Sequence, residues 1–214
     1  PSLDLWLSSV SFDPTAPTFQ DPRNAPLTAG APTAFEIPAN VAAARVPPVN
    51  VTNQQIANGV QWITGGTHHS VAIEMRDHVI LVEAPLNEDR VAPVVAKVKE
   101  LFPNKPIRFV VNTHIHFDHS GGLRTAVAEG ATVVTHGSNR AYYQNAWKAP
   151  RTLSPDKLSA TSRIPAFVPV TEKYVMTDTP ARPGGRTVEI HRIAGNPDRK
   201  STRLNSSHGY ISYA

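Results

Sequence analysis

The stretch that decides the fold of this chain is a short polar loop, which reads Asn112-Thr113-His114-Ile115-His116-Phe117-Asp118-His119-Ser120-Gly121-Gly122. Three of the nine histidines in the 214 residues stand in it, with an aspartate, in the spacing HxHxDH. In an extended segment, side chains two residues apart project to the same side, so His114 and His116 can converge on one cation. Asp118 and His119 follow where the chain turns, and they can offer oxygen and nitrogen to a second cation.

This pattern is typical of metal-assisted hydrolysis. Two metal ions about 3.5–4 Å apart can hold a hydroxide that is nucleophilic at neutral pH and can polarise the bond it attacks. We therefore expect the four motif residues to be metal ligands, and Asp118 also to be catalytic because it positions the nucleophile. The alternative is a polar turn of solvated histidines, although core packing has no use for so many imidazoles at this spacing.

Further candidates lie beside the motif or in the preceding segment. Gly121 and Gly122 lack a Cβ, so they would let the backbone lie close to a substrate or ligand. His68 and His69 follow two glycines between two expected strands, where they either face the site or end a turn. We expect the other histidines of the central segment to be surface or structural residues, namely His78, His136 and His191.

Working outward from the loop, the preceding residues predict a meander, a helix and a buried strand. The expected elements are strands at 60–63, 70–75 and 78–83, a helix at about 89–102 and a strand at 107–111. Asn87 is a plausible cap of the helix and Pro103 is its stop. Pro93 fits only if it lies in the first turn or if the helix is kinked there.

The residues after the loop continue the alternation of helices and strands. We expect a helix at about 120–129, a strand at 131–135, a helix at about 138–146 and strands at 171–176 and 186–193. Between them, 147–170 carries prolines and serines and reads as a lid or a disordered insert. The first 50 residues hold nine of the 20 prolines, and they read as one strand at 4–11 followed by a linker.

At this loop the sequence resembles the metallo-β-lactamase fold superfamily of hydrolases. The likeness extends over residues 59–146, including Gly-Gly-Thr-His-His-Ser-Val-Ala and Val-Glu-Ala-Pro-Leu-Asn-Glu. It implies an α+β protein with an αββα sandwich, of which this chain carries the N-terminal half. It also implies that His114 and His116 belong to a first metal site and Asp118 and His119 to a second. Glu83 stands where many relatives have an aspartate that supports the ligands.

The resemblance further implies zinc, with two ions per intact domain, and the nitrogen-rich ligand set would also accept iron or manganese. It implies a third histidine after an element like Ala194-Gly195-Asn196-Pro197, where this chain has Asp198, and further ligands beyond Ala214. Residues 198–208 and 211–214 can be back-translated to codons that resemble a common short-read library adapter, and residues 209–210 fit its six-base index. We therefore expect 1–50 to end an upstream β-rich region, 51–197 to be the N-terminal part of the hydrolase domain, and 198–214 to be a non-native tail. His208 is then no ligand.

Composition narrows the classes of function. The chain has no cysteine, which excludes disulfides and thiolate metal sites, and no apolar run approaches the ~18 residues that span a bilayer. The net charge is +4, of which residues 198–214 carry +2, and no Lys/Arg cluster is interleaved with aromatics. We expect neither membrane insertion nor a nucleic-acid partner. The oligomeric state stays open, and a periplasmic or secreted location in a bacterium would require a signal peptide upstream of Pro1.

Three functions remain for such a chain. The first is a metal-dependent hydrolase, in which a metal-bound hydroxide attacks an ester, lactam or related bond of a small-molecule substrate. The second is a catalytically incomplete fragment that binds metal weakly, because two ligands per site are fewer than the three of catalytic zinc. In that case we also expect the missing half to leave an apolar face of the sheet exposed. The third is a phosphodiesterase or nuclease of the same fold.

Overall fold

The structure, a computed structural model, describes residues 48–152, 155–178 and 185–193, together with the backbone of a strand at 202–206. All of them belong to one unit that begins at Pro48. The strand expected at 4–11 and most of the expected linker lie outside the described residues. The domain boundaries expected after residues 50 and 197 stay predictions.

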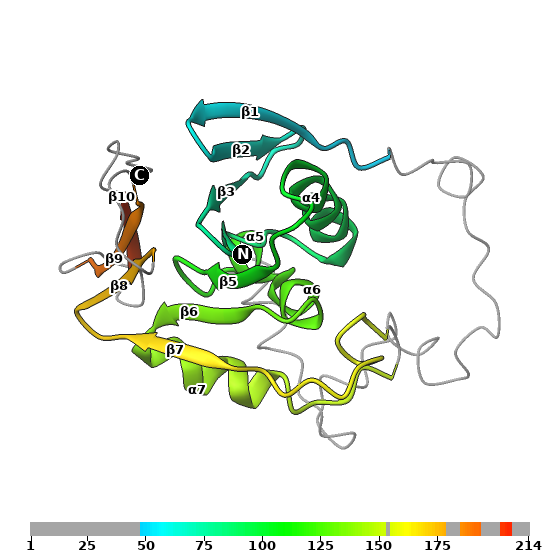
Figure 1. Cartoon of the computed structure of the whole chain (residues 1–214). Helices are drawn as coiled ribbons and strands as arrows, with labels where there is room; N and C mark the ends of the chain where they lie inside the picture. Colours follow the sequence, from blue (N-terminus) through cyan, green and yellow to red (C-terminus); the bar gives the residue numbers. More distant parts are fainter. Residues whose placement is uncertain (1–47, 153–154, 179–184, 194–201, 207–214) are drawn as a thin grey trace, which may run out of the picture. The chain divides into compact units, whose positions relative to one another are not determined.

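Seven strands form the larger sheet, in the order β1-β2-β3-β4-β5-β6-β7 (Figure 1). Their bounds are β1 Thr52–Ala57, β2 Val60–Thr64, β3 Ser70–Glu74, β4 Val79–Val82, β5 Ile107–Val111, β6 Thr132–His136 and β7 Phe167–Val170. Strands β1 to β4 pair antiparallel and strands β4 to β7 pair parallel. Parallel neighbours need crossovers, and the helices supply them.

Four helices connect the parallel strands: α4 Glu88–Leu101, α5 Phe117–Ser120, α6 Leu123–Ala128 and α7 Gly137–Ala146. The predicted cap of α4 is confirmed, because the side chain of Asn87 accepts a hydrogen bond from the backbone N–H of Arg90 at 3.0 Å. Of the two alternatives for Pro93, a place in the first turn is excluded, since the helix begins at Glu88, and a kink stays a prediction. The helix continues through Pro93, whose missing N–H faces the carbonyl of an exposed residue, Asp89.

A second sheet of three antiparallel strands has the order β10-β9-β8, with bounds β8 Lys173–Thr177, β9 Thr187–Arg192 and β10 Thr202–Ser206. The alternation of side chains along β4 shows how the layers meet. Val79 and Leu81 belong to the core cluster that includes the valines of α4. Ile80 and its neighbour Val82 belong to a second cluster, which includes Val188 and Ile190 of β9.

The described part of the molecule therefore has a layer of helices, a mixed sheet and a smaller sheet. This arrangement confirms the α+β class and corresponds to the first layers of the expected αββα sandwich. The expectation of an exposed apolar face on the central strands is wrong, because Ile80 and Val134 are fully buried beneath residues of β8 and β9. Strand β10 lies in the tail that we expect to be non-native, and that origin stays a prediction.

Three other expectations need correction. The helix expected at 120–129 is present but shorter, as α6, and a further short helix, α5, lies in the segment expected to be a polar loop. The segment 147–170 is no simple lid, because it contributes β7 as an edge of the large sheet and buries Leu158. His78 is not a surface residue: it is 8% exposed, and its ring lies against Phe109. Among the described residues, no helix is long and apolar enough to cross a membrane.

A buried ion pair fastens the segment after α7 to the helical layer. Asp156 accepts hydrogen bonds from Nε and Nη2 of Arg124, and from the backbone N–H and hydroxyl of Ser159 at 2.9 and 2.7 Å. The side chains of Arg124 and Asp156 are only 10% and 13% exposed. The hydrogen bond from Arg124 in particular holds the pKa of the Asp156 carboxyl far below its ordinary value.

This ion pair predicts a loss of stability in acid. Between the ordinary and the lowered pKa of Asp156, the unfolded chain binds a proton that the folded chain does not, so stability falls as the pH drops below about 4. We expect Asp156→Asn to be less stable than the wild type at pH 7 and to lose part of this acid slope in urea denaturation. Glu100→Gln, which alters a pair with a 67% exposed carboxylate, serves as the control. An unchanged slope in Asp156→Asn would contradict the assignment.

Candidate functional site

The motif begins at the carboxyl end of β5, above a buried hydrogen-bond network. The side-chain oxygen of Asn112 accepts hydrogen bonds from the hydroxyls of Tyr143 at 2.6 Å and Thr135 at 3.2 Å. Its amide nitrogen donates to the carbonyl of His114 at 2.6 Å. Burial raises the pKa of Tyr143 well above its ordinary value, so its hydroxyl keeps the proton that it donates. The network fixes the backbone from which the first histidine projects.

The structure brings the four motif side chains together, and His68 joins them. The ring of His114 lies 4.1 Å from that of His119 and 4.8 Å from that of His116, between centroids. Oδ2 of Asp118 lies 3.5 Å from Nε2 of His119 and 3.7 Å from Nε2 of His68. The segment is not fully extended as expected, because it bends at residue 115 and enters α5 at residue 117.

Glu83 links the ends of three elements at this site. It follows β4 with a φ of 64°, a left-handed conformation that costs a residue with a Cβ about 1–2 kcal/mol. Its Oε1 accepts a hydrogen bond from the backbone N–H of Thr113 at 2.7 Å, and its Oε2 lies 2.5 Å from Nδ1 of His119. This hydrogen bond raises the pKa of His119 above its ordinary value, although burial opposes the shift. Glu83 therefore holds His119 with Nε2 toward Asp118.

The raised pKa of His119 can be tested by removing the charge of its partner. In Glu83→Gln the backbone conformation is kept, but the carboxylate that stabilises the imidazolium is lost, so we expect the pKa of His119 to fall. Titration of the imidazole C–H signals by NMR in metal-free protein measures it. The matched control is Glu189→Gln, which changes a carboxylate that lies 3.0 Å from another histidine, His191. An equal pKa of His119 in the wild type and Glu83→Gln would remove Glu83 from this role.

The carboxyl of Asp118 stays ionised. Its partial desolvation tends to raise its pKa, but a hydrogen bond with its own backbone N–H and the nearby imidazoles of His119, His68 and His114 outweigh that effect, so the pKa lies below its ordinary value. An ionised carboxylate is an acceptor and a potential metal ligand.

The remaining candidates lie around these residues. His69 turns to Trp62, with ring centroids 4.9 Å apart, and its Nδ1 lies 2.8 Å from the hydroxyl of Thr64. The two glycines allow close packing of the chain on itself: a Cβ on Gly121 would lie 1.8 Å from the carbonyl oxygen of Leu86, and one on Gly122 would lie 2.2 Å from a methyl group of α4. Their predicted contact with substrate stays a prediction.

The chemistry of the donors fits a divalent metal ion, since imidazole nitrogen and carboxylate oxygen are the usual ligands of zinc in the absence of cysteine. Their arrangement does not complete a site. Within the part of the chain that the structure describes, no three His, Asp or Glu side chains form a group that could hold a metal ion. Nδ1 of His119 faces Glu83, and Nδ1 of His114 lies 2.9 Å from the hydroxyl of Thr113, so Nε2 is the ring nitrogen that each of these histidines has left for a metal ion.

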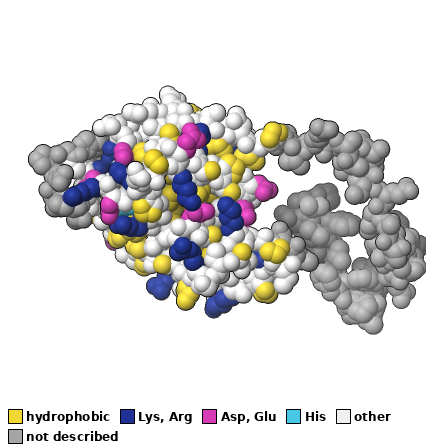
Figure 2. Space-filling view, turned by 45° about the vertical axis from the view of Figure 1, so that its right-hand side comes forward, with side chains coloured by type: hydrophobic (Ala, Val, Ile, Leu, Met, Phe, Trp, Pro, Cys, Tyr) yellow, Lys and Arg dark blue, Asp and Glu magenta, His cyan; other side chains and the backbone are white. Residues whose placement is uncertain are grey.

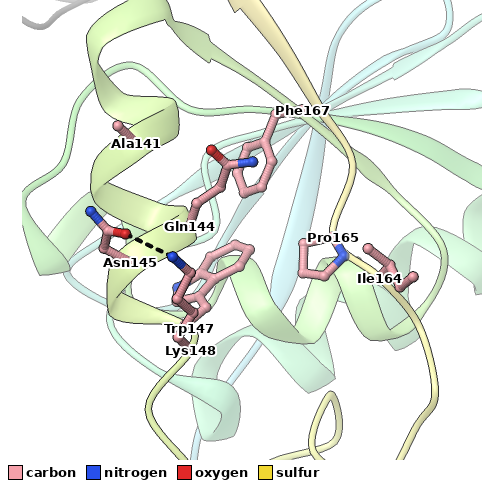
Figure 3. A pocket seen from close by; sticks show the side chains of 8 residues that line it. All are labelled: Ala141, Gln144, Asn145, Trp147, Lys148, Ile164, Pro165 and Phe167. Atoms are coloured by element: carbon pink, nitrogen blue, oxygen red, sulfur yellow. Dashed lines mark hydrogen bonds between the residues drawn. The ribbon is translucent and has the colours of Figure 1, made fainter.

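A hollow of about 400 Å³ lies between α7 and the segment that leads into β7 (Figure 3). Trp147, Pro165 and Phe167 line it, with Ile164 at its edge. Beside it, Nζ of Lys148 donates a hydrogen bond to the side-chain oxygen of Asn145. None of the motif residues lines this hollow. It is therefore separate from the histidine cluster.

The model of the metallo-beta-lactamase superfamily matches residues 63–192, which is more than half of the chain. The chain belongs to the metallo-beta-lactamase superfamily. Proteins of this superfamily are hydrolases and generally bind metal ions such as zinc. A search of curated protein sequences finds no significant match.

Solved metallo-beta-lactamase structures share the fold. The chain is similar to a metallo-beta-lactamase from Pontibacter korlensis, with a TM-score of 0.54, 16% identity and coverage of 74% of this chain and 68% of that one. For a metallo-beta-lactamase from Hirschia baltica the TM-score is 0.51 and the identity is 20%, with coverage of 74% of this chain and 67% of that one. For a HARLDQ motif mutant of a metallo-beta-lactamase from Cronobacter sakazakii (Enterobacter sakazakii) the TM-score is 0.51 and the identity is 24%, with coverage of 75% of this chain and 62% of that one. The chain thus spans about two thirds of these proteins, and the likeness shows the fold alone.

Proposed function

We propose that this chain is the ligand-bearing part of a metal-dependent hydrolase that cleaves an ester, lactam or related bond in a small-molecule substrate. The observation that carries the proposal is the gathering of three imidazoles and one ionised carboxylate at the end of β5, within a superfamily of hydrolases. His114 and His116 would hold a first divalent ion, and Asp118 and His119 a second. When bound, such an ion supplies Lewis acidity that activates water and polarises the scissile bond.

The protein's own groups prepare this chemistry. Glu83 fixes the ring of His119, and the network around Asn112 fixes the backbone at His114. Ligands that are held in place lose little freedom on metal binding, and groups behind the ligands typically change metal affinity 10–100-fold. Phe117 stands 71% exposed between two ligand positions, so it offers an apolar contact to a bound substrate.

The second candidate, an incomplete fragment with weak metal affinity, is favoured by the absence of a three-ligand group among the described residues. The two candidates share the ligands and differ in affinity and turnover. Nucleic acid is a less favoured substrate, because residues 1–197 carry a net charge of only +2. On the face drawn in Figure 2, lysines and arginines are mixed with acidic and uncharged side chains.

Metal binding is tested with His116→Ala. We expect zinc affinity in isothermal titration to fall at least about tenfold while the far-UV circular dichroism stays the same, because the exposed His116 contributes little to packing. The matched control is His191→Ala, which removes a partly exposed imidazole from β9. Equal zinc affinity of His116→Ala and the wild type would refute the assignment.

Hydrolysis is tested with Asp118→Asn, which keeps the shape of the side chain and removes its charge. We expect hydrolysis of a panel of chromogenic esters and lactams by the zinc-loaded chain to fall by about 100-fold or more, because the variant loses a group that binds the second ion and orients water. The wild type with excess chelator gives the background. Turnover by the chelated wild type would refute metal dependence, and zinc binding without turnover would favour the incomplete fragment.

A further inference from the structure

The loop that brings His68 to the site is held by a buried arginine on another element. Arg90, in the first turn of α4, is 4% exposed. Its Nη2 donates to the carbonyl of Thr64 at 3.1 Å and to that of His68 at 3.0 Å, so one nitrogen joins both ends of the loop between β2 and β3. Its Nη1 donates to the carbonyl of Asn50 at 2.8 Å, before β1.

A contribution to stability alone does not explain why this guanidinium is buried. Within the described residues Arg90 has no ion pair with a carboxylate, and its Nε is buried without a hydrogen-bond partner. Burial accordingly lowers its pKa. A buried charge without a counterion is costly, whereas the fixed fork of a guanidinium is well suited to holding several carbonyls in one geometry.

Contacts within the loop lead from Arg90 to the motif. Gly66 lies over the guanidinium, where a Cβ would approach Nη1 of Arg90 to 3.3 Å. The hydroxyl of Thr67 lies 2.9 Å from Nδ1 of His68. Nε2 of the same ring then faces Asp118 Oδ2 at 3.7 Å, and the ring stands edge-on to His119 at 6.4 Å between centroids.

We propose that Arg90 is a positioning residue of the candidate metal site, which acts by clamping the loop 65–69 so that His68 stays against Asp118. Only the last step, from His68 to the metal, rests on the proposed function. The clamp itself is a property of the metal-free chain.

The clamp is tested by hydrogen–deuterium exchange of the full chain without metal. In Arg90→Lys the charge remains, but one ammonium cannot reach all three carbonyls. We expect exchange in peptides that cover 64–70 to become about tenfold faster, while the rest of the large sheet is unchanged. The control is Arg124→Lys, another buried arginine of the helical layer, which binds Asp156 and should leave 64–70 unchanged. Unchanged exchange of 64–70 in Arg90→Lys overturns the proposal.

A second variant guards against misfolding of Arg90→Lys. In Gly66→Ala the arginine is kept and the added methyl group crowds it, so we expect the same local increase in exchange. If Arg90→Lys does not fold, unchanged exchange of 64–70 in Gly66→Ala overturns the proposal.

The link to the metal is tested by titrating Co²⁺ and recording its visible absorption. We expect Arg90→Lys and His68→Ala each to weaken Co²⁺ binding by about tenfold, and the double variant to be no weaker than His68→Ala. Additive losses, or unchanged affinity in Arg90→Lys, overturn the positioning role even where the wild type binds Co²⁺. A wild type that binds no Co²⁺ refutes the proposed function and this last step, and exchange then still decides the clamp.

Discussion

The candidate site depends on one carboxylate, that of Glu83, which joins the ends of β4 and β5 to α5. It accepts a hydrogen bond from the backbone of Thr113 and contacts the ring of His119. Glu83 adopts a left-handed backbone conformation, which costs folding free energy and places this side chain between Thr113 and His119. Glu83 thereby fixes the position of Thr113, at the start of the loop, relative to His119, the last histidine of the motif. The other candidate ligands lie between these two residues in the sequence.

Much of this arrangement could be predicted from local sequence. The strand at 107–111 agrees with β5 in both bounds, and Asn87 caps α4 as expected. Such features depend on neighbours in the chain, such as a run of buried residues or a cap and its helix. The spacing of the motif likewise predicts that its side chains gather, because they are only a few residues apart.

Other features depend on distant partners and left no local pattern. Arg90 reads as an ordinary residue of an amphipathic helix, and only its three carbonyl partners, 22 to 40 residues away in sequence, reveal its burial. Pro169 and its neighbours suggested an irregular insert, although a proline is tolerated in an edge strand such as β7. The close packing at Gly121 also depends on a distant segment, because the backbone of Leu86 fills the space beside it.

The change from antiparallel to parallel pairing at β4 has a consequence for how this protein can diversify. Strands β4 to β7 all end at the same edge of the sheet, so Glu83 and the histidine motif share that edge with the junction between β6 and α7 and with the turn that follows β7. Insertions or substitutions in those connections would reshape the surroundings of the ligands without altering strand register or core packing. One scaffold can in this way acquire new selectivity by exchanging the turns along a single rim.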